Sequence, residues 1–455
     1  MDDALTYAEQ HLDTFVGELE ELLRIPSVST DPAYAEHVQE AADWLGDRFE
    51  EAGLDHSEVV DTDGHPIVYA DHHVGDDRPT VLVYGHYDVQ PPDPLEEWDT
   101  DPFEPTRRND TLYARGACDD KGQMYMHVAA AEALLETGTP PVNLKFIIEG
   151  EEEVGSEHLA PFLEARQEDL AADVVLISDT SMFSPEVPTI TYGLRGLAYA
   201  EVTLEGPNRD LHSGVYGGGV ENPANALSAL IAGLHDEDHR VAIPGFYENV
   251  RDLTPEERAT YAELPFDEEA WAAEIGLDAT KTETGYSVLE CLSARPTLDV
   301  NGIWGGYTGE GAKTVLPATA HAKISMRLVP EQTPEEAYDK LEAHLAAEVP
   351  ETMTLTVRRL HGGRPVLVDR TSDAMQAATQ AMGEVMGPEP RLVRHGGSIP
   401  IVADFKDILG LDSVLLGFGL NADAIHSPNE HFGLDRFAQG LRSILRFHHH
   451  YAASQ

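Results

Sequence analysis

Five short motifs of this 455-residue chain carry histidine or carboxylate side chains where runs of apolar residues end. Imidazole and carboxylate ligands together suit zinc, manganese or cobalt better than calcium or an iron–sulfur cluster. The motifs therefore predict a metal centre, and the residues that could build it are His86 in GHYD, Asp119 in RGACDDKG, the glutamates of EGEEEVGS at 149–156, Asp179 in SDT and His426 in AIHSPNE.

Each motif alone also has an ordinary structural interpretation. A histidine after a strand is often a satisfied structural residue, and paired aspartates at a helix start are often an N-cap. The glutamate run is the strongest of the five. It closes the buried strand Leu144–Ile148, where uncompensated carboxylates would repel one another and cations would relieve the cost. Asp88 is placed to hold His86 through its second ring nitrogen. Cys118 is either a further ligand or, as we favour, a small buried filler.

A centre with two such metal ions can hydrolyse an amide bond. Two metal ions about 4 Å apart polarise a carbonyl and convert water to hydroxide near neutral pH. A further carboxylate must take the proton of the water and return it to the leaving amine, and Glu152 or Glu151 can do this.

The elements around the motifs predict an α/β fold. Short apolar runs at Val81–Tyr84, Leu144–Ile148 and Val174–Ile177 are typical of strands buried on both faces of a largely parallel sheet. Ligands in such sheets bind at the carboxyl ends of strands, where these motifs lie. Helices are predicted over 3–24, 35–53, 122–136 and 372–386, and a last strand over 413–418.

The pattern changes near Gly193. Residues 197–204 alternate as a half-buried strand does, and the strands and helices predicted from 197 to 360 follow the order βαββαβ, which is typical of a small sheet with helices on one face. We therefore predict a catalytic domain of residues 1–192 and 364–455, with a mixed sheet flanked by helices, interrupted by an α+β lid or dimerisation domain of residues 193–363. The stretch 236–290 is acidic and helical, and its role is open.

Charge is the most unusual bulk property. There are 30 Lys and Arg against 82 Asp and Glu, a formal net charge of −52. Such a field repels nucleic acid and anionic lipid, so neither is expected as a partner. Self-repulsion destabilises a compact fold unless salt screens it, which predicts a cytoplasm with molar salt. The two cysteines, the absence of a long apolar run and the acidic N-terminus also favour a reduced, cytoplasmic protein with no signal peptide.

The chain resembles a family of di-metal peptidases that includes carnosine dipeptidases, acetylornithine deacetylase and succinyl-diaminopimelate desuccinylase. The resemblance is carried by GHYDVQP (85–91), RGACDDKGQ (115–123), EGEEEVGS (149–156), SDT (178–180), DLHSGVYGG (210–218), GAKTVLP (311–317), SMRLVP (325–330), GGSIP (396–400) and HSPNE (426–430). These motifs span most of the chain and are most similar to the dipeptidase branch.

The resemblance implies roles at the metal centre. His86 and Asp179 bind one metal ion, Glu153 and His426 bind the other, and Asp119 bridges both through a cis peptide to Asp120. Zinc is the preferred ion, with manganese and cobalt as alternatives. Asp88 orients His86, and the first Glu of the Glu-Glu-x-Gly signature, Glu152, is the general base.

The resemblance also implies how a substrate is held. His212 reaches the site from the partner in a homodimer and helps to hold the oxyanion. Arg327 binds the terminal carboxylate of a short peptide, and Thr314, Gly397 and Ser398 contact the substrate. The implied activity is that of a dipeptidase. The alternatives are an N-acyl amino acid deacylase with the same site and a non-catalytic binding protein, which the presence of Glu152 and all five ligands disfavours.

Overall fold

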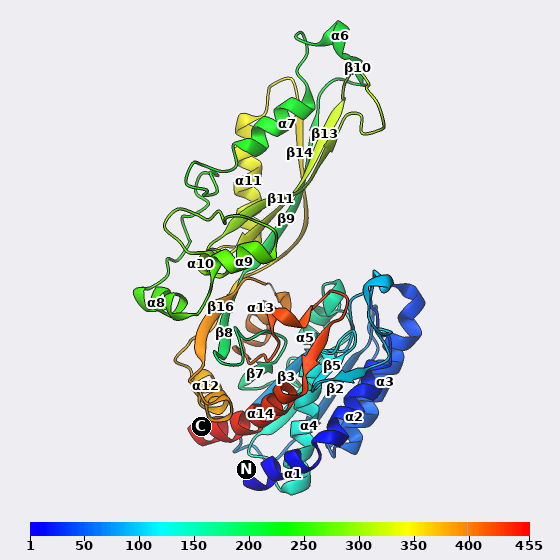
Figure 1. Ribbon diagram of the computed structural model, residues 1–455, viewed down its shortest axis with the longest axis vertical. Coiled ribbons are helices and arrows are strands. Elements are labelled where there is room, and N and C mark those ends of the chain that lie inside the picture. The colour runs from blue at the N-terminus through cyan, green and yellow to red at the C-terminus, as the bar shows by residue number, and fades with distance from the viewer. Residues whose placement is uncertain (398) are drawn as a thin grey trace. The chain divides into compact units, whose positions relative to one another are not determined.

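The structure is a computed structural model that describes residues 1–397 and 399–455. The chain forms two compact units, shown as a ribbon in Figure 1. Unit 1 comprises residues 1–192, 368–393 and 404–455, and unit 2 comprises residues 193–367 and 394–403. None of the helices in the described part of the chain is long and apolar enough to cross a membrane.

The large sheet is mixed, as predicted. Its nine strands follow the order β1-β2-β6-β3-β7-β17-β8-β15, with β16 also paired to β8. The four central strands are mutually parallel, and β1, β2 and β8 are antiparallel to their neighbours. The bounds are β1 His56–Val60, β2 Ile67–His72, β3 Thr80–His86, β6 Asn143–Glu149, β7 Val174–Ile177, β8 Thr189–Leu194, β15 Val366–Leu367, β16 Arg391–His395 and β17 Ser413–Leu415.

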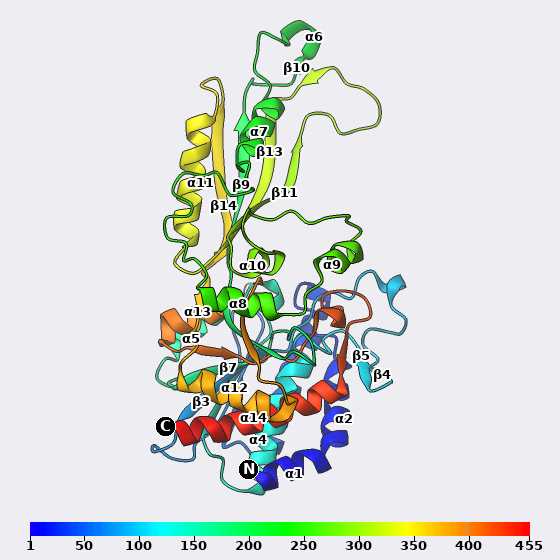
Figure 2. The same cartoon turned by 60° about the vertical axis from the view of Figure 1, so that its left-hand side comes forward.

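Helices cover this sheet, so its central strands are buried on both faces. Every residue of β7, and every residue of β3 after Thr80, is buried. Helix α4 packs against α1, α2 and α14, and α12 lies beside α14 in both views (Figures 1 and 2). The helices of unit 1 are α1 Asp2–Gln10, α2 Leu12–Leu23, α3 Ala35–Glu51, α4 Lys121–Thr137, α5 Leu159–Ala165, α12 Asp373–Met386 and α14 Leu434–Ser454.

One predicted helix is two helices. The apolar periodicity of residues 3–24 predicts a continuous helix, but α1 ends at Gln10 and α2 begins at Leu12. The break lies at His11, whose ring stacks on Tyr7 with centroids 3.8 Å apart and whose Nδ1 lies 2.9 Å from the Tyr7 carbonyl oxygen. The ring thereby competes for a helical carbonyl group, which favours a local break.

Unit 2 contains the predicted βαββαβ motif. Its antiparallel sheet has the order β11-β13-β9-β14. Helices α7 and α11 cover one face, and the apolar core lies between them and the sheet (Figure 1). On β13, alternate residues from Ala320 to Leu328 point into this core, so Arg327 lies on the opposite face. The elements are β9 Gly196–Glu205, α7 Pro223–Ala232, β11 Thr297–Gly305, β13 Thr319–Leu328, α11 Pro334–Glu348 and β14 Thr354–Gly363.

Residues 394–403 group with unit 2, whereas the sequence pattern assigned them to the catalytic domain. Three contacts explain the grouping. The Arg394 guanidinium pairs with Glu257 at 2.5 Å, the Arg394 amide donates to the Tyr261 hydroxyl at 3.1 Å, and Arg195 Nε donates to the Gly396 carbonyl at 3.0 Å. These partners lie more than 100 positions away in sequence, so periodicity does not reveal them.

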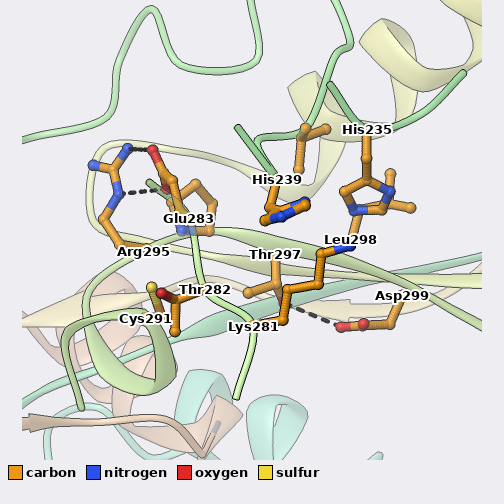
Figure 3. Close-up of a pocket in the computed structure, with 12 residues that line it drawn as sticks. His235, His239, Lys281, Thr282, Glu283, Cys291, Arg295, Thr297, Leu298 and Asp299 are labelled. Atoms are coloured by element: carbon orange, nitrogen blue, oxygen red, sulfur yellow. Dashed lines mark hydrogen bonds and ion pairs between the residues drawn. The ribbon is translucent and has the colours of Figure 1, made fainter. Parts of the chain in front are cut away.

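The stretch 236–290 contains two short helices, α8 Pro255–Glu263 and α9 Glu268–Glu274, and runs into α10 Val288–Ser293. Part of it lines a cavity of about 430 Å³ (Figure 3). One wall is the buried ion pair of Arg295 and Glu283, with Nη2–Oε1 at 2.7 Å and Nε–Oε2 at 2.9 Å. None of the described site residues predicted from the sequence lines this cavity.

Candidate metal centre

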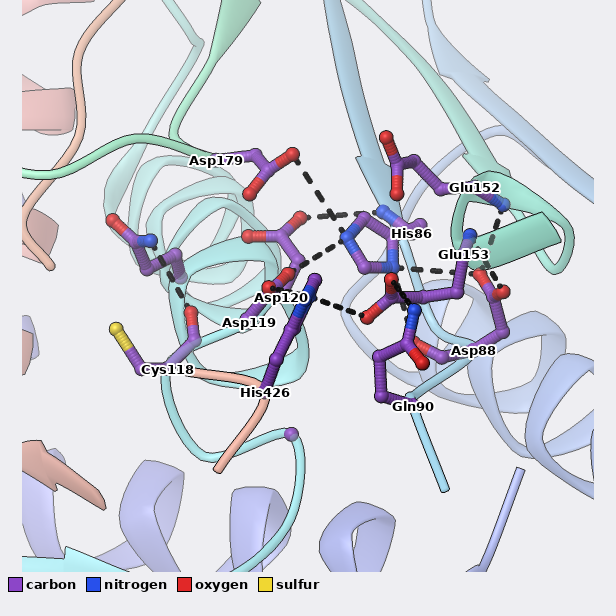
Figure 4. Close-up of polar contacts among 12 residues, drawn as sticks. His86, Asp88, Gln90, Cys118, Asp119, Asp120, Glu152, Glu153, Asp179 and His426 are labelled. Carbon is purple, nitrogen blue, oxygen red and sulfur yellow. Dashed lines mark hydrogen bonds and ion pairs between the residues drawn. The ribbon is translucent and has the colours of Figure 1, made fainter. Parts of the chain in front are cut away.

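The parallel strands bring four of the five motifs to one edge of the sheet. His86 is the last residue of β3, the glutamate run follows β6, Asp179 follows β7, and His426 lies in the loops beyond β17. Because β6, β3, β7 and β17 are adjacent and parallel, their carboxyl ends meet at the same edge. Asp119 completes the cluster just before α4 (Figure 4).

Asp119 lies between the two histidines. Its Oδ1 is 3.1 Å from His86 Nε2, and its Oδ2 is 2.9 Å from His426 Nε2. One carboxylate oxygen therefore faces each imidazole, which is the arrangement that a bridging ligand requires. The Asp119–Asp120 peptide bond is cis.

Two further carboxylates complete two groups of three. Asp179 Oδ2 is 3.9 Å from His86 Nε2, and Glu153 Oε1 is 3.2 Å from His426 Nε2. The structure thus brings together His86, Asp119 and Asp179 in one group, and Asp119, Glu153 and His426 in the other, with ligand atoms within 4.8 Å of one another.

These groups fit divalent metal ions. Ligand atoms about 2.0–2.2 Å from a tetrahedral zinc ion lie roughly 3.3–3.6 Å from one another, close to the separations above. The Oε1 of Glu153 is buried, and the polar atom that it faces at 3.2 Å is His426 Nε2, itself a candidate ligand, so one cation could take both atoms. Cys118 belongs to neither group. Its thiol is buried and donates to Asp423 Oδ2 at 3.4 Å, which agrees with the filler interpretation.

The charges of the cluster also call for cations. Burial, followed by the nearby Asp119 and Asp120 carboxylates, raises the pKa of Asp179 well above its ordinary value. Hydrogen bonds to Asp119 and Glu153 raise the pKa of His426 to about 10. Although burial favours its neutral form, hydrogen bonds from His426 and His86 hold the pKa of Asp119 below its ordinary value. The carboxylates thus attract positive charge strongly, and divalent ions would supply it.

Asp88 holds two of the loops that carry candidate ligands. It is fully buried, and its Oδ1 and Oδ2 accept the backbone N–H groups of Glu152 and Glu153 at 3.2 and 3.1 Å. Its Oδ1 also lies 3.4 Å from His86 Nδ1, while the Asp88 carbonyl oxygen is 3.0 Å from the same nitrogen. Both contacts leave His86 Nε2 facing Asp119.

The structure separates the two glutamates that residue types alone left as alternatives for the base. Glu151 is engaged elsewhere: its Oε1 accepts the His65 N–H at 3.0 Å and its Oε2 lies 2.8 Å from His158 Nδ1. The carboxylate of Glu152 has no hydrogen-bond partner within the described chain and lies beside the cluster (Figure 4). Burial, together with Glu153 and Asp119, raises the pKa of Glu152 to about 7.

Gln90 is a contact that the sequence analysis missed. Its Nε2 donates to Glu153 Oε2 at 2.7 Å, which leaves Oε1 of the same carboxylate facing His426. The only signal was its place in the GHYDVQP motif, since an amide side chain does not by itself indicate a metal centre.

Among the predicted substrate residues, those that the structure describes lie in unit 2. His212 pairs with Val315 across β10 (Leu211–His212) and β12 (Val315–Leu316), and the Ser213 amide donates to the Thr314 carbonyl at 3.0 Å, so His212 and Thr314 are neighbours. Arg327 is half-buried, and burial lowers its pKa. The Gly397 amide donates to His395 Nδ1 at 3.1 Å. Ser398 lies outside the described residues.

The chain is similar to known peptidases over most of its length. The sequence profile of peptidase family M20/M25/M40 matches residues 82–450. The "Cys-Gly metallodipeptidase dug1" of Schizosaccharomyces pombe is 34% identical over 469 residues, covering 100% of this chain and 98% of that protein.

Two solved structures are similar over nearly the whole chain. The M20 family metallo-carboxypeptidase Sso-CP2 from Sulfolobus solfataricus has a TM-score of 0.85 and 34% identity, covering 96% of this chain and 99% of the other. Human carnosine dipeptidase 1 has a TM-score of 0.82 and 31% identity, covering 99% of this chain and 98% of the other.

Proposed function

The chain belongs to peptidase family M20/M25/M40, and from this premise we propose that it is a metal-dependent dipeptidase acting on short peptides with a free C-terminal carboxylate. The observation that carries the proposal is Asp119, which offers one oxygen to each of two histidines while Asp179 and Glu153 complete the two groups. Both the fission-yeast relative and human carnosine dipeptidase 1 bear the name of dipeptidase, which favours that substrate class.

His86 and Asp179 would hold one ion, Glu153 and His426 the other, and Asp119 would bridge them. Bound divalent ions supply Lewis acidity, which polarises the scissile carbonyl and lowers the pKa of water. We prefer zinc because the candidate ligands are imidazoles and carboxylates, with manganese and cobalt as alternatives.

Glu152 acts as the general base and acid. Its carboxylate takes a proton from the attacking water as the new C–O bond forms, and it then returns that proton to the leaving amine as the amide C–N bond breaks. The engagement of Glu151 with His65 and His158 supports this choice. Asp88 keeps the backbone of Glu152 in place through the hydrogen bond to its amide.

In the same proposal, residues 193–363 form a lid and dimerisation domain that supplies the substrate contacts. The Arg327 guanidinium binds the terminal carboxylate, a pairing that suits its planar fork. His212 of the partner subunit in a homodimer donates to the developing oxyanion, and Thr314, Gly397 and Ser398 contact the peptide. The charge of −52 supports a halophilic protein of a salt-rich cytoplasm.

A substrate panel separates this function from an N-acyl amino acid deacylase with the same site. Wild-type protein and Glu152→Gln would be assayed in molar KCl with each metal on dipeptides, C-terminally amidated dipeptides, and N-acetyl and N-succinyl amino acids. We expect wild type to cleave free dipeptides and to leave the amidated ones intact. Glu152→Gln should retain its metal ions and lose most turnover. Cleavage of acyl amino acids alone would overturn the dipeptidase assignment, and unchanged turnover in Glu152→Gln would overturn the role of Glu152.

A further inference from the structure

Glu430 is a fully buried carboxylate with four hydrogen-bond donors around it. Its Oε1 accepts the backbone N–H groups of Cys118 and Asp119 at 2.9 and 3.1 Å. Its Oε2 accepts the Gly116 N–H at 3.0 Å and the Arg115 Nη1 at 2.7 Å. The Glu430 side chain therefore accepts hydrogen bonds from most of the backbone N–H groups of the loop 116–119, which ends at Asp119.

Glu430 also lies close in sequence to His426, the candidate ligand that faces Asp119. Glu430 follows His426 by four positions, and its carbonyl oxygen accepts the Ala114 N–H at 3.2 Å. Beyond it, β18 (His431–Gly433) pairs with β5 (Thr111–Tyr113), so the two segments lie against each other from 111 to 119. The segments carrying Asp119 and His426 are thereby held together by hydrogen bonds around Glu430.

These bonds are strong enough to fix the loop. Hydrogen bonds to a charged acceptor are stronger than those between neutral groups, and a buried donor left without a partner destabilises the folded state. The Asp119 amide is one of these donors, so the bond to Glu430 acts directly on the residue whose carboxylate faces both histidines.

We infer that Glu430 is a positioning residue that sets the separation of the Asp119 and His426 side chains and thereby the affinity of the group formed by Asp119, Glu153 and His426 for a divalent metal ion. The inference rests on the metal centre of the proposed function, and it adds a residue that binds neither metal nor substrate. The competing explanation is that the Glu430–Arg115 ion pair only stabilises the fold.

The substitution Glu430→Gln separates these explanations because it preserves shape. Each carboxylate oxygen serves two donors, so the amide must turn its NH₂ group toward one of these pairs, whichever way it is oriented. Loss of a partner that orients a ligand typically lowers metal affinity 10- to 100-fold. We therefore expect the ion held by Asp119, Glu153 and His426 to bind more weakly by roughly that factor.

A matched control lies in the same unit. Glu132 on α4 pairs with the buried Arg48 and accepts the Tyr7 hydroxyl at 2.9 Å. It is roughly 17 Å along the helix from Lys121, at 1.5 Å per residue. Glu132→Gln also weakens a buried arginine–glutamate pair but touches no loop of the centre. It should lower the unfolding temperature and leave both metal affinities unchanged.

The experiment strips metal from full-length wild type and both variants with a chelator and titrates Co²⁺ or Zn²⁺ against a chromophoric competitor in molar KCl. Thermal unfolding of the metal-free proteins is measured in parallel. A 10- to 100-fold weaker equivalent in Glu430→Gln alone supports the inference. Wild-type affinity for both equivalents in Glu430→Gln, with a lowered unfolding temperature, overturns it.

Hydrogen exchange of the metal-free wild type gives a second test that needs no variant. The amides of Gly116, Cys118 and Asp119 should exchange as slowly as those inside α4, because Glu430 holds them without the metal. Exchange at the rate of an exposed loop would overturn the inference. If wild type binds two ions but cleaves no dipeptide, the proposed function fails while the role of Glu430 stands.

Discussion

Asp88→Asn tests whether a buried carboxylate positions both the first histidine and the glutamate loop. The carboxylate of Asp88 accepts two backbone N–H groups, at 3.2 and 3.1 Å, and lies 3.4 Å from His86 Nδ1. In the variant the side-chain oxygen of asparagine still accepts one of these backbone N–H groups, but its NH₂ group faces the other N–H group and cannot accept from it. One bond to a charged acceptor is lost, which costs about 1.5–3 kcal/mol, and the remaining bond no longer has a charged acceptor.

Part of this cost should appear at the metal centre, because His86 and Glu153 belong to different groups and Asp88 contacts the segments of both. We expect metal affinity to fall about 10- to 100-fold, equivalent to about 1.4–2.7 kcal/mol, with kcat/KM falling in parallel at limiting metal. Competition titration with a chromophoric chelator measures the affinity, and dipeptide hydrolysis at a series of free metal concentrations measures kcat/KM.

Asp173→Asn is a control at the far end of the same strand, where the aspartate is exposed. Asp173 Oδ2 accepts the Thr80 N–H at 2.7 Å, at the opposite end of β3 from His86, roughly 20 Å away at 3.3 Å per residue. This variant loses an aspartate acceptor at the same strand without touching the centre, so metal affinity should stay at the wild-type value. If Asp88→Asn also binds both ions at wild-type affinity and keeps its kcat/KM, Asp88 does not position the centre.

Two further predictions concern salt and pH. The unfolding temperature and activity should rise from 0.1 to 2 M KCl, because the screening length falls from about 10 Å to below about 3 Å and weakens the self-repulsion of −52 charges; equal stability in dilute buffer would contradict the halophilic proposal. Burial lowers the pKa of His127 and of His448 to about 3. The unfolded rings take up protons below pH 6.5 while the folded ones stay neutral, so the stability present above pH 6.5 is lost as the pH falls toward 3, by about 2 kcal/mol for each histidine at pH 5. His448→Leu should therefore show a smaller drop in unfolding temperature between pH 7 and pH 5 in constant KCl than wild type, and an identical drop would refute this origin of acid sensitivity.

Much of the fold follows from local patterns. Continuous apolar runs predicted β3, β6 and β7 because strands of a covered parallel sheet bury both faces, and alternation predicted β9 because its sheet has one covered face. The histidines and carboxylates indicated a metal centre because their motifs lie at the ends of predicted strands, where ligands of such sheets bind. These signals lie within a few neighbouring positions, so the sequence alone contains them.

Local sequence patterns did not reveal the contacts between segments that are distant in sequence. Glu430 and Asp119 are 311 positions apart, and nothing in the HSPNE or RGACDDKG motifs says that the carboxylate of one accepts the amide of the other. Likewise, the choice between Glu151 and Glu152 depends in part on His65, which lies 86 positions before Glu151 and which only the fold brings to its carboxylate. The residue types identified the candidate ligands and bases. The hydrogen bonds that hold Asp119 and Glu151 became visible only in the folded structure.

The central claim is that two metal ions on these residues are required for peptide hydrolysis. The most direct measurement is the dipeptidase activity of chelator-treated protein in molar KCl as Zn²⁺, Mn²⁺ or Co²⁺ is added back in known amounts. The proposed centre predicts no turnover without metal and activity that rises until two equivalents per chain are bound. Full turnover in the metal-free protein, or no turnover once two equivalents of each metal are bound, would contradict it.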